Sequence, residues 1–374
     1  MTSKERILAA IRHEEPDRVP ISPRLFSWLQ ANHGGIDLET HLKNLPDMDF
    51  MFIIEESTTN YLEIYPDEYF LPDVKVDQKK YQEGDLLAVE RTFHTPGGIL
   101  TDRTLIPPAN RVYGLFPNPI KTEYIVKSPA DLDLVPYILP AINTNYDFYR
   151  NQLQQIGDRG VIMVGVRSAI DHNAGFARCM EDLMMDYYDN RKLLQNLLNI
   201  FHQRALAQTK AALENGVQFI FSSWYFASIS SGWSPKIYEE VFLPLLKEHV
   251  DLVHSYDAYY DYYDDGKLND TMEKISSAGV DILETCTPRP VGDFNLKQAK
   301  EKIGSRTTIK GFIDLLEIVR NGTPKIIEQE VERAMDIAKP GGGFIIGSSD
   351  SFREDTPNEN VAAYFKACKK YGKY

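Results

Sequence analysis

Apolar and polar positions alternate along the chain in a way that predicts eight buried strands. Strand-like apolar segments lie at 18–22, 50–54, 161–166, 217–223, 280–285, 307–312 and 343–349, with a tyrosine-rich stretch, DAYYDYYDDGKL, at 257–268. Helical spacing occurs at 193–212, 235–253, 269–278, 296–303, 326–338 and 358–371. Regular alternation of strands and helices predicts parallel pairing with right-handed crossovers. We therefore expect an α/β protein, a (β/α)8 TIM barrel.

The pattern changes after the second predicted strand. Between residues 61 and 108, the segments LLAVERTF and ILTDRTLI flank a turn with the sequence Thr95-Pro96-Gly97-Gly98. Two strand patterns around a Gly-containing turn predict an antiparallel β-hairpin. We interpret 61–108 as a hairpin insertion within a single domain that covers residues 1–374. An open doubly wound sheet is the alternative, and the lack of a GxGxxG motif after the first strand disfavours it.

Composition narrows the class of protein. The chain has 374 residues, 43% of them hydrophobic and 25% charged, with a formal net charge of −13 and no Lys/Arg cluster, so nucleic-acid binding is not expected. The three cysteines, Cys179, Cys286 and Cys368, are far apart and odd in number, which favours a reducing cytoplasm over a disulfide framework. No apolar run is long enough to span a membrane, and the N-terminus resembles an amphipathic helix rather than a signal peptide.

Residues that follow the strands of a barrel share one pocket, so strand ends supply the candidate site. Three carboxylate groups can converge there, at Glu55/Glu56, at Asp264/Asp265 and at Glu284. Close carboxylates either hold a metal or raise one another's pKa for acid/base work. The structural alternative for each is a helix N-cap or a salt bridge to Arg24 or Lys310. We expect Asp314 to cap the helix that follows it.

Other strand-end residues are candidates for ligand binding. We expect Arg24, His172, Trp224, Tyr225 and Asp350 to bind substrate together with Glu55. An inert loop histidine is the alternative for His172, and core packing is the alternative for the two aromatic residues. Cys286 is interpreted as a semi-buried thiol without chemistry.

Four segments resemble the uroporphyrinogen-decarboxylase-like family. They are KERILAAIRHEEPDRVP, GWSPKIYEEVFLPLLKEHVDLVH, PVGDFNLKQAKEKIGSRTTIKGFID and KPGGGFIIGSSDSFREDTPNENVAAYF. This resemblance covers nearly the whole chain and implies a (β/α)8 barrel. The family includes a decarboxylase of tetrapyrrole biosynthesis and methyltransferases that move methyl groups to or from a corrinoid protein.

The two branches of the family differ at motifs that this chain has altered. The decarboxylase carries paired arginines near its N-terminus, whereas VPISPRLFSWL has only Arg24, and Asp350 in GSSDS stands near the position of a histidine. The methyltransferases hold zinc through His-x-Cys after the fifth strand and Cys after the last strand. Here those positions are Tyr263-Asp264-Asp265-Gly266 and Ser348 or Ser349. The usual zinc ligands are therefore absent, and any metal ion would use Asp265 and Glu284.

These observations lead to a working hypothesis and two alternatives. We expect a cytoplasmic enzyme, a corrinoid-linked methyltransferase or demethylase of a small methylated substrate, with Asp265, Tyr263 and Glu284 as catalytic residues. Its cofactor is unknown; a divalent ion is compatible with the sequence, as are a corrinoid protein as partner and a homodimer. The first alternative is a uroporphyrinogen-type carboxy-lyase in which Arg24 holds a carboxylate. The second is a non-catalytic binding barrel that has lost its metal ligands.

Overall fold

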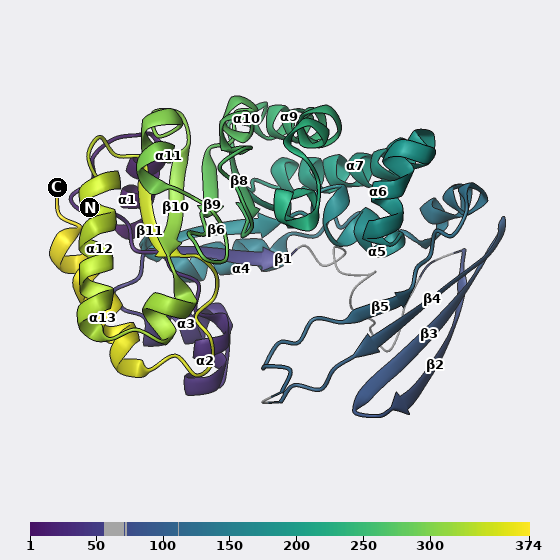
Figure 1. The fold of residues 1–374 in the computed structure, drawn as a ribbon, viewed down its shortest axis with the longest axis horizontal. Coiled ribbons are helices and arrows are strands. Elements are labelled where there is room, and N and C mark those ends of the chain that lie inside the picture. The colour runs from purple at the N-terminus through teal and green to yellow at the C-terminus, as the bar shows by residue number, and fades with distance from the viewer. Residues whose placement is uncertain (56–70, 72, 111) are drawn as a thin grey trace. The chain divides into compact units, whose positions relative to one another are not determined.

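The structure of the protein, a computed structural model, describes residues 1–55, 71, 73–110 and 112–374 and, at 172 and 173, the backbone only. Within these ranges the chain forms two compact units (Figure 1). The first unit contains Met1–Ile54, Asn145–Gly165 and Ala212–Tyr374. The second contains Glu55–Thr144 and Val166–Ala211. The expectation of a single domain stays a prediction.

A seven-stranded parallel sheet is the centre of the first unit, in the order β1-β6-β7-β8-β9-β10-β11. Its strands are β1 (Phe50–Glu55), β6 (Gly160–Gly165), β7 (Phe219–Ser223), β8 (Tyr259–Asp264), β9 (Ile282–Thr285), β10 (Thr308–Ile313) and β11 (Phe344–Ser348). Almost every position of β6 to β11 is buried on both faces, as expected of parallel strands covered by helices. The α/β class and seven of the predicted strands are therefore confirmed.

Ten α-helices of this unit precede, separate or follow its strands along the described part of the chain. They are α1 (Ser3–Ile11), α2 (Phe26–His33), α3 (Leu38–Asn44), α4 (Asp147–Ile156), α8 (Pro235–Ile237), α9 (Leu243–His254), α10 (Met272–Ser277), α11 (Leu296–Lys302), α12 (Pro324–Ala338) and α13 (Asn358–Tyr371). Helices α4, α9 and α12 pack on β6, β8 and β10 in turn. Asp314 caps the π-helical turn η7 (Leu315–Arg320) by accepting from the Glu317 N–H at 2.6 Å, as predicted. None of the helices in the described ranges combines the length and apolar character needed to cross a membrane.

Residues 18–22 do not form the eighth ladder strand that we predicted. Ile21 makes an isolated parallel bridge to Ile346 of β11, and its carbonyl accepts from the Asp49 N–H at 2.8 Å. Pro20 has no N–H to donate, which shortens any ladder through this segment. The buried Asp49 carboxylate holds the segment instead, because it accepts from Arg18 and Arg6 at 2.6 Å each and from the Ile21 N–H at 2.8 Å.

The second unit carries a four-stranded antiparallel sheet, β2-β3-β4-β5. Its strands are β2 (Lys75–Glu83), β3 (Leu86–Thr95), β4 (Gly98–Ile106) and β5 (Ile120–Glu123), and the unit also holds η1 (Pro129–Ile138), η3 (Ile170–Ala174), α5 (Gly175–Ala177), α6 (Met180–Asp189) and most of α7 (Arg191–Glu214). The predicted hairpin is present as β3 and β4, paired from Thr95↔Gly98 outward. Residues 61–70 of the expected insertion lie outside the described residues.

Candidate functional site

The register of three neighbouring strands brings a tyrosine, a carboxylate and a lysine into one row. Tyr263 of β8 pairs with Glu284 of β9, and Glu284 pairs with Lys310 of β10. Register partners in a sheet project from the same face, so these three side chains lie side by side near the carboxyl ends of the strands. All three are buried. Two of the three predicted catalytic residues, Tyr263 and Glu284, are therefore neighbours.

Arg24 reaches this row from the segment that Asp49 anchors. Its backbone N–H donates to Ser348 Oγ at 3.2 Å, at the end of β11. Its Nε donates to Glu284 Oε1 at 2.8 Å, and its guanidinium carbon lies 4.4 Å from the ring centroid of Tyr263. A guanidinium over an aromatic face is favourable and holds the ring and the cation in place. The row thus becomes a four-residue cluster, which we call the Arg24–Glu284 cluster: Arg24, Tyr263, Glu284 and Lys310.

Glu284 is an ionised counterion within this cluster. Lys310 Nζ lies 2.8 Å from Glu284 Oε1, and the two side chains are each only 3% exposed. Burial alone would raise the pKa of Glu284, but the charges and hydrogen bonds of Arg24 and Lys310 outweigh it and hold that pKa well below its usual value. A carboxylate in this state cannot donate a proton at neutral pH. For Glu284, the sequence left open a structural alternative, a salt bridge to Arg24 or Lys310. Glu284 forms both of these salt bridges.

A further carboxyl group, that of Asp261, is buried behind the cluster and was not among the predicted site residues. It lies two residues before Tyr263 on β8, so it projects from the same face, and it is 1% exposed. Burial, and then the negative charge of Glu284, raise the pKa of Asp261 well above its usual value. Among described residues, no donor reaches either Asp261 oxygen or Glu284 Oε2. A protonated Asp261 that donates to Glu284 would satisfy both carboxyl groups at once.

The charges of this group sum to a positive value. Arg24 and Lys310 contribute two positive charges against the one negative charge of Glu284, and burial favours the neutral form of Asp261 by raising its pKa. The Nη2 of Arg24 is buried and has no hydrogen-bond partner within the described ranges. A buried unsatisfied guanidinium nitrogen is costly, and an incoming oxygen atom would relieve that cost. A small cavity beside Arg24, Glu284 and Lys310, with room for about one water molecule, is lined mainly by apolar residues of the 23–26 segment and of β1.

Tyr263 keeps its phenolic proton. Burial first, and then the charges of Asp350 and Asp265, raise the pKa of Tyr263 well above its usual value. Its hydroxyl donates to Asp265 Oδ2 over a long 3.4 Å. Asp350 also acts electrostatically on Arg24, and its carboxylate pairs with Arg353 Nη2 at 3.3 Å. The predicted residues Asp265 and Asp350 are therefore near the cluster, and Tyr263 is suited to donate a hydrogen bond rather than to ionise.

Trp224 and Tyr225 follow β7. The indole N–H of Trp224 donates to Tyr260 Oη at 2.9 Å, and its ring stacks on Tyr262 at an interplanar angle of 13°. Trp224 is only 1% exposed, which fits the core-packing alternative, and its role in ligand binding stays a prediction. Tyr225 is half-buried, with its ring edge-on to that of Phe226.

The remaining predicted residues belong to the second unit. Glu55 Oε2 lies 3.8 Å from Arg167 Nε, and Arg167 Nη1 lies 3.8 Å from Asp171. The backbone of His172 is part of η3, its side chain is outside the description, and Glu56 lies outside the described residues. The roles expected for Glu55 and His172 stay predictions.

The residues present do not fit the zinc site that the family resemblance implied. Oxygen side chains stand at the expected thiol and imidazole positions, and no three His, Cys, Asp or Glu side chains form a metal-binding group within the described part of the chain. Glu284 Oε1 already accepts from two cations, which removes it as an attractive ligand for a third. Cys286 is fully buried, donates to the Leu283 carbonyl at 3.2 Å, and has its pKa raised by burial.

The backbone at the ends of β9 and β10 is strained. Thr285, Cys286 and Phe312 have positive φ angles of 74°, 48° and 93°, and Gly311 has a φ of 129°. Non-glycine residues in this region cost about 1–3 kcal/mol each and cluster at functional sites. The strain therefore lies beside Glu284 and Lys310.

Gly311→Ala is expected to lower the stability of the protein by about 2 kcal/mol or more, because an added Cβ would approach the Thr285 carbonyl oxygen to 2.3 Å at a positive φ. Urea denaturation would measure the change. Gly34→Ala is the matched control, since Gly34 also has a positive φ but has open space around its Cβ position. Equal losses in the two variants would show that the close approach to Thr285 does not matter.

Comparisons with known proteins agree with this fold. Residues 115–371 match the model of the family described as uroporphyrinogen decarboxylase. A methyltransferase from Methanosarcina mazei is similar over 99% of both chains, with a TM-score of 0.65 at 16% sequence identity, which bears on the fold alone. A D-psicose 3-epimerase from Clostridium cellulolyticum H10 is 12% identical over 64% of this chain and 86% of its own, and its TM-score of 0.37 carries no argument. No curated protein matches the sequence.

Proposed function

Because this chain belongs to the uroporphyrinogen decarboxylase family, we propose that it is an enzyme that transfers a methyl group from a small methylated compound to a corrinoid carried by a partner protein. The observation that carries this proposal is the buried carboxyl group of Asp261, whose pKa is raised by burial and by Glu284, behind a cationic, aromatic-walled cluster at the strand ends. Part of the proposal is a complete eight-stranded barrel, in which residues 18–22 occupy the place between β11 and β1. The bonds of Ile21 and Ser22 to Ile346 and Asp49 support that placement.

Each residue of the cluster has a task in this proposal. Tyr263 and Arg24 Nη2 donate hydrogen bonds to the heteroatom that bears the methyl group, and the aromatic rings of Tyr263 and Phe221 flank the substrate. When bound, a reduced corrinoid supplies the nucleophile that accepts the methyl group. As the bond between carbon and heteroatom breaks, the heteroatom takes the proton of Asp261, while Glu284 stays ionised as the counterion of Arg24 and Lys310. Proton transfer of this kind contributes about 10²–10⁴-fold to a rate.

Anaerobic incubation with cob(I)alamin and small methylated donors tests the proposal. We expect donor-dependent loss of the cob(I)alamin absorbance, and at least a tenfold slower rate in Arg24→Gln, which loses a charge-assisted hydrogen bond of about 1.5–3 kcal/mol. Arg150→Gln is the control, since Arg150 is half-exposed and pairs only with Asp147 on the same helix among described residues. The absence of methyl transfer from every donor would contradict the proposal.

Decarboxylation of a carboxylate substrate is the second candidate, and the unpartnered Nη2 of Arg24 is the observation that favours it. A substrate carboxylate at Arg24 would form a charge-assisted bond. In this case uroporphyrinogen should be consumed anaerobically without a corrinoid. A protein that neither transfers methyl groups nor consumes uroporphyrinogen would instead favour a binding barrel without catalysis.

A further inference from the structure

A pocket of about 490 Å³ opens on the first unit, between α2, the Asn44–Asp47 segment and α13. Residues of the Arg24–Glu284 cluster do not line it, so its chemistry is separate from the proposed reaction. Its volume falls within the range of small-molecule sites, about 300–1,000 Å³. The middle of the pocket is apolar, formed by Trp28, Leu45, Pro46, Val361 and Phe365.

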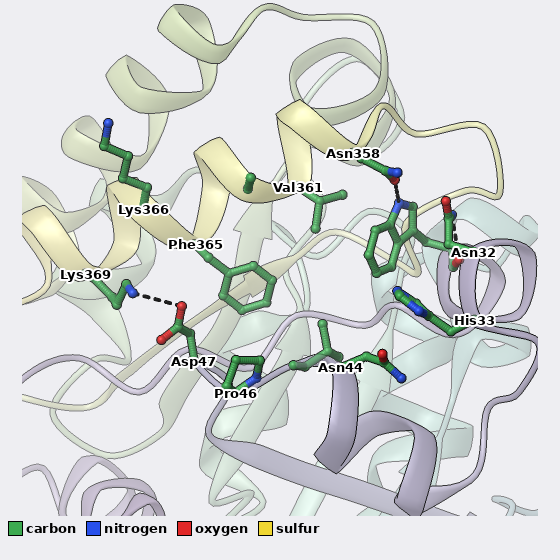
Figure 2. A pocket seen from close by; sticks show the side chains of 13 residues that line it. Asn32, His33, Asn44, Pro46, Asp47, Asn358, Val361, Phe365, Lys366 and Lys369 are labelled. Carbon is green, nitrogen blue, oxygen red and sulfur yellow. Dashed lines mark hydrogen bonds and ion pairs between the residues drawn. The ribbon is translucent and has the colours of Figure 1, made fainter.

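Polar side chains gather at the two ends of this pocket. Figure 2 shows Asn32, His33 and Asn44 together at one end and the Asp47–Lys369 ion pair at the other. The Nδ2 of Asn32 donates to the Trp28 carbonyl at 2.9 Å, and the Nδ2 of Asn44 donates to the Thr40 carbonyl at 2.8 Å. A carbonyl partner requires the amide nitrogen, so the orientation of both amides is determined.

The consequence is a surplus of hydrogen-bond acceptors beside an aromatic wall. The amide oxygens of Asn32 and Asn44 have no hydrogen-bond partner among the described residues, and the ring of His33 lies edge-on to that of Trp28 at 5.3 Å. Trp28 and Phe365 are 7% and 8% exposed, so each presents only a small apolar face. A ligand that suits this pocket has a flat apolar ring and an N–H or O–H donor.

We infer that this pocket is an accessory binding site for a small, flat aromatic molecule that carries a ring N–H or O–H donor. The ring lies between α2 and α13, and the donor bonds the amide oxygen of Asn44 or Asn32. This inference does not depend on the proposed reaction. Backbone hydrogen bonds connect the site to Arg24, since the Trp28 N–H donates to the Phe352 carbonyl at 3.1 Å and the Phe352 N–H donates to the Arg24 carbonyl at 2.9 Å.

Calorimetric titration of the full chain with indole and 1-methylindole tests the inference. Indole should bind with a stoichiometry of one, about three- to tenfold more tightly than 1-methylindole, because one hydrogen bond is worth about 0.5–1.5 kcal/mol. Asn32→Leu combined with Asn44→Leu removes both candidate amide oxygens and should remove this difference. Indole should also slow hydrogen exchange at the Trp28 and Phe352 amides. Equal affinities for the two probes, or unchanged exchange, would overturn the inference.

Two variants test whether indole binds in this pocket. Ala362→Trp places a large side chain at an exposed position that lines the pocket, and it should abolish indole binding. Glu359→Trp adds the same bulk at an exposed position of α13 outside the lining and should leave binding intact. Indole binding that survives in Ala362→Trp overturns the inference. The inference is also overturned if the wild-type protein does not bind indole and Ala362→Trp changes the oligomeric mass. That pair of results would make the pocket an interface between copies of the chain.

Discussion

Asp261→Asn is expected to slow methyl transfer by about 10²–10⁴-fold and, at neutral pH, to make the protein more stable. The rate falls because Asn has no acidic proton to give to the leaving heteroatom. Stability rises because the wild-type protein must keep a proton on a buried carboxyl group, whereas Asn is neutral at every pH and can still donate to Glu284 Oε2.

The raised pKa of Asp261 fixes the direction in which the free energy of unfolding changes with pH. The pKa of Asp261 is raised in the folded protein, so between its unfolded pKa, about 3.9, and its folded pKa the folded state binds more protons than the unfolded state. The free energy of unfolding therefore falls as pH rises through that window, and this fall should be absent in Asp261→Asn. Glu284 has the opposite behaviour, because its pKa is lowered and its contribution is lost only as pH falls through that low value.

Urea denaturation at pH 5 and pH 8, together with the anaerobic methyl-transfer assay, measures both effects. Asp336→Asn is the control, because Asp336 is exposed on α12 and should change neither quantity. A variant at position 261 that is less stable than wild type at pH 8, yet equally active, would contradict the role of Asp261 as a proton source.

Glu284→Gln is expected to lower the free energy of unfolding by about 3 kcal/mol, since removing one partner of a buried ion pair leaves uncompensated charge in the interior. Glu284 is 3% exposed and is the carboxylate that both Arg24 and Lys310 contact. Without it the cluster carries two positive charges. The stability of the variant should then rise with pH as Asp261 ionises and takes over as counterion.

A double-mutant cycle tests whether unpaired positive charge causes the loss of stability in Glu284→Gln. Lys310→Met combined with Glu284→Gln removes one charge of each sign and should recover most of the stability lost in Glu284→Gln alone, as measured by urea denaturation. Additive losses in the two single variants would show that Lys310 and Glu284 are not energetically coupled.

The order of apolar and polar residues along the chain was sufficient to predict most of its local helices and strands. Strands β6 to β11 could be predicted because each is a short buried run bounded by turn residues, and the cap at Asp314 because capping depends on a few neighbouring residues. The segment at 18–22 was predicted as a strand and makes isolated bridges in place of a ladder. Its apolar pattern is strand-like, but its position depends on Asp49, about 30 residues away, and on Ile346 of β11.

Strand ends could be named from the sequence, but the chemistry of their side chains could not. Glu284 was expected to be catalytic because it ends a strand, and its ionised, double-paired state arises from Arg24, which is 260 residues distant in the chain. Asp261 was missed although one signal was present, a lone carboxylate between aromatic residues in a buried strand. The register of the strands decides which strand-end side chains face each other, and burial decides which of them keep a proton. The sequence therefore determined the local elements and the family. The tertiary structure alone decided the charge state of the site.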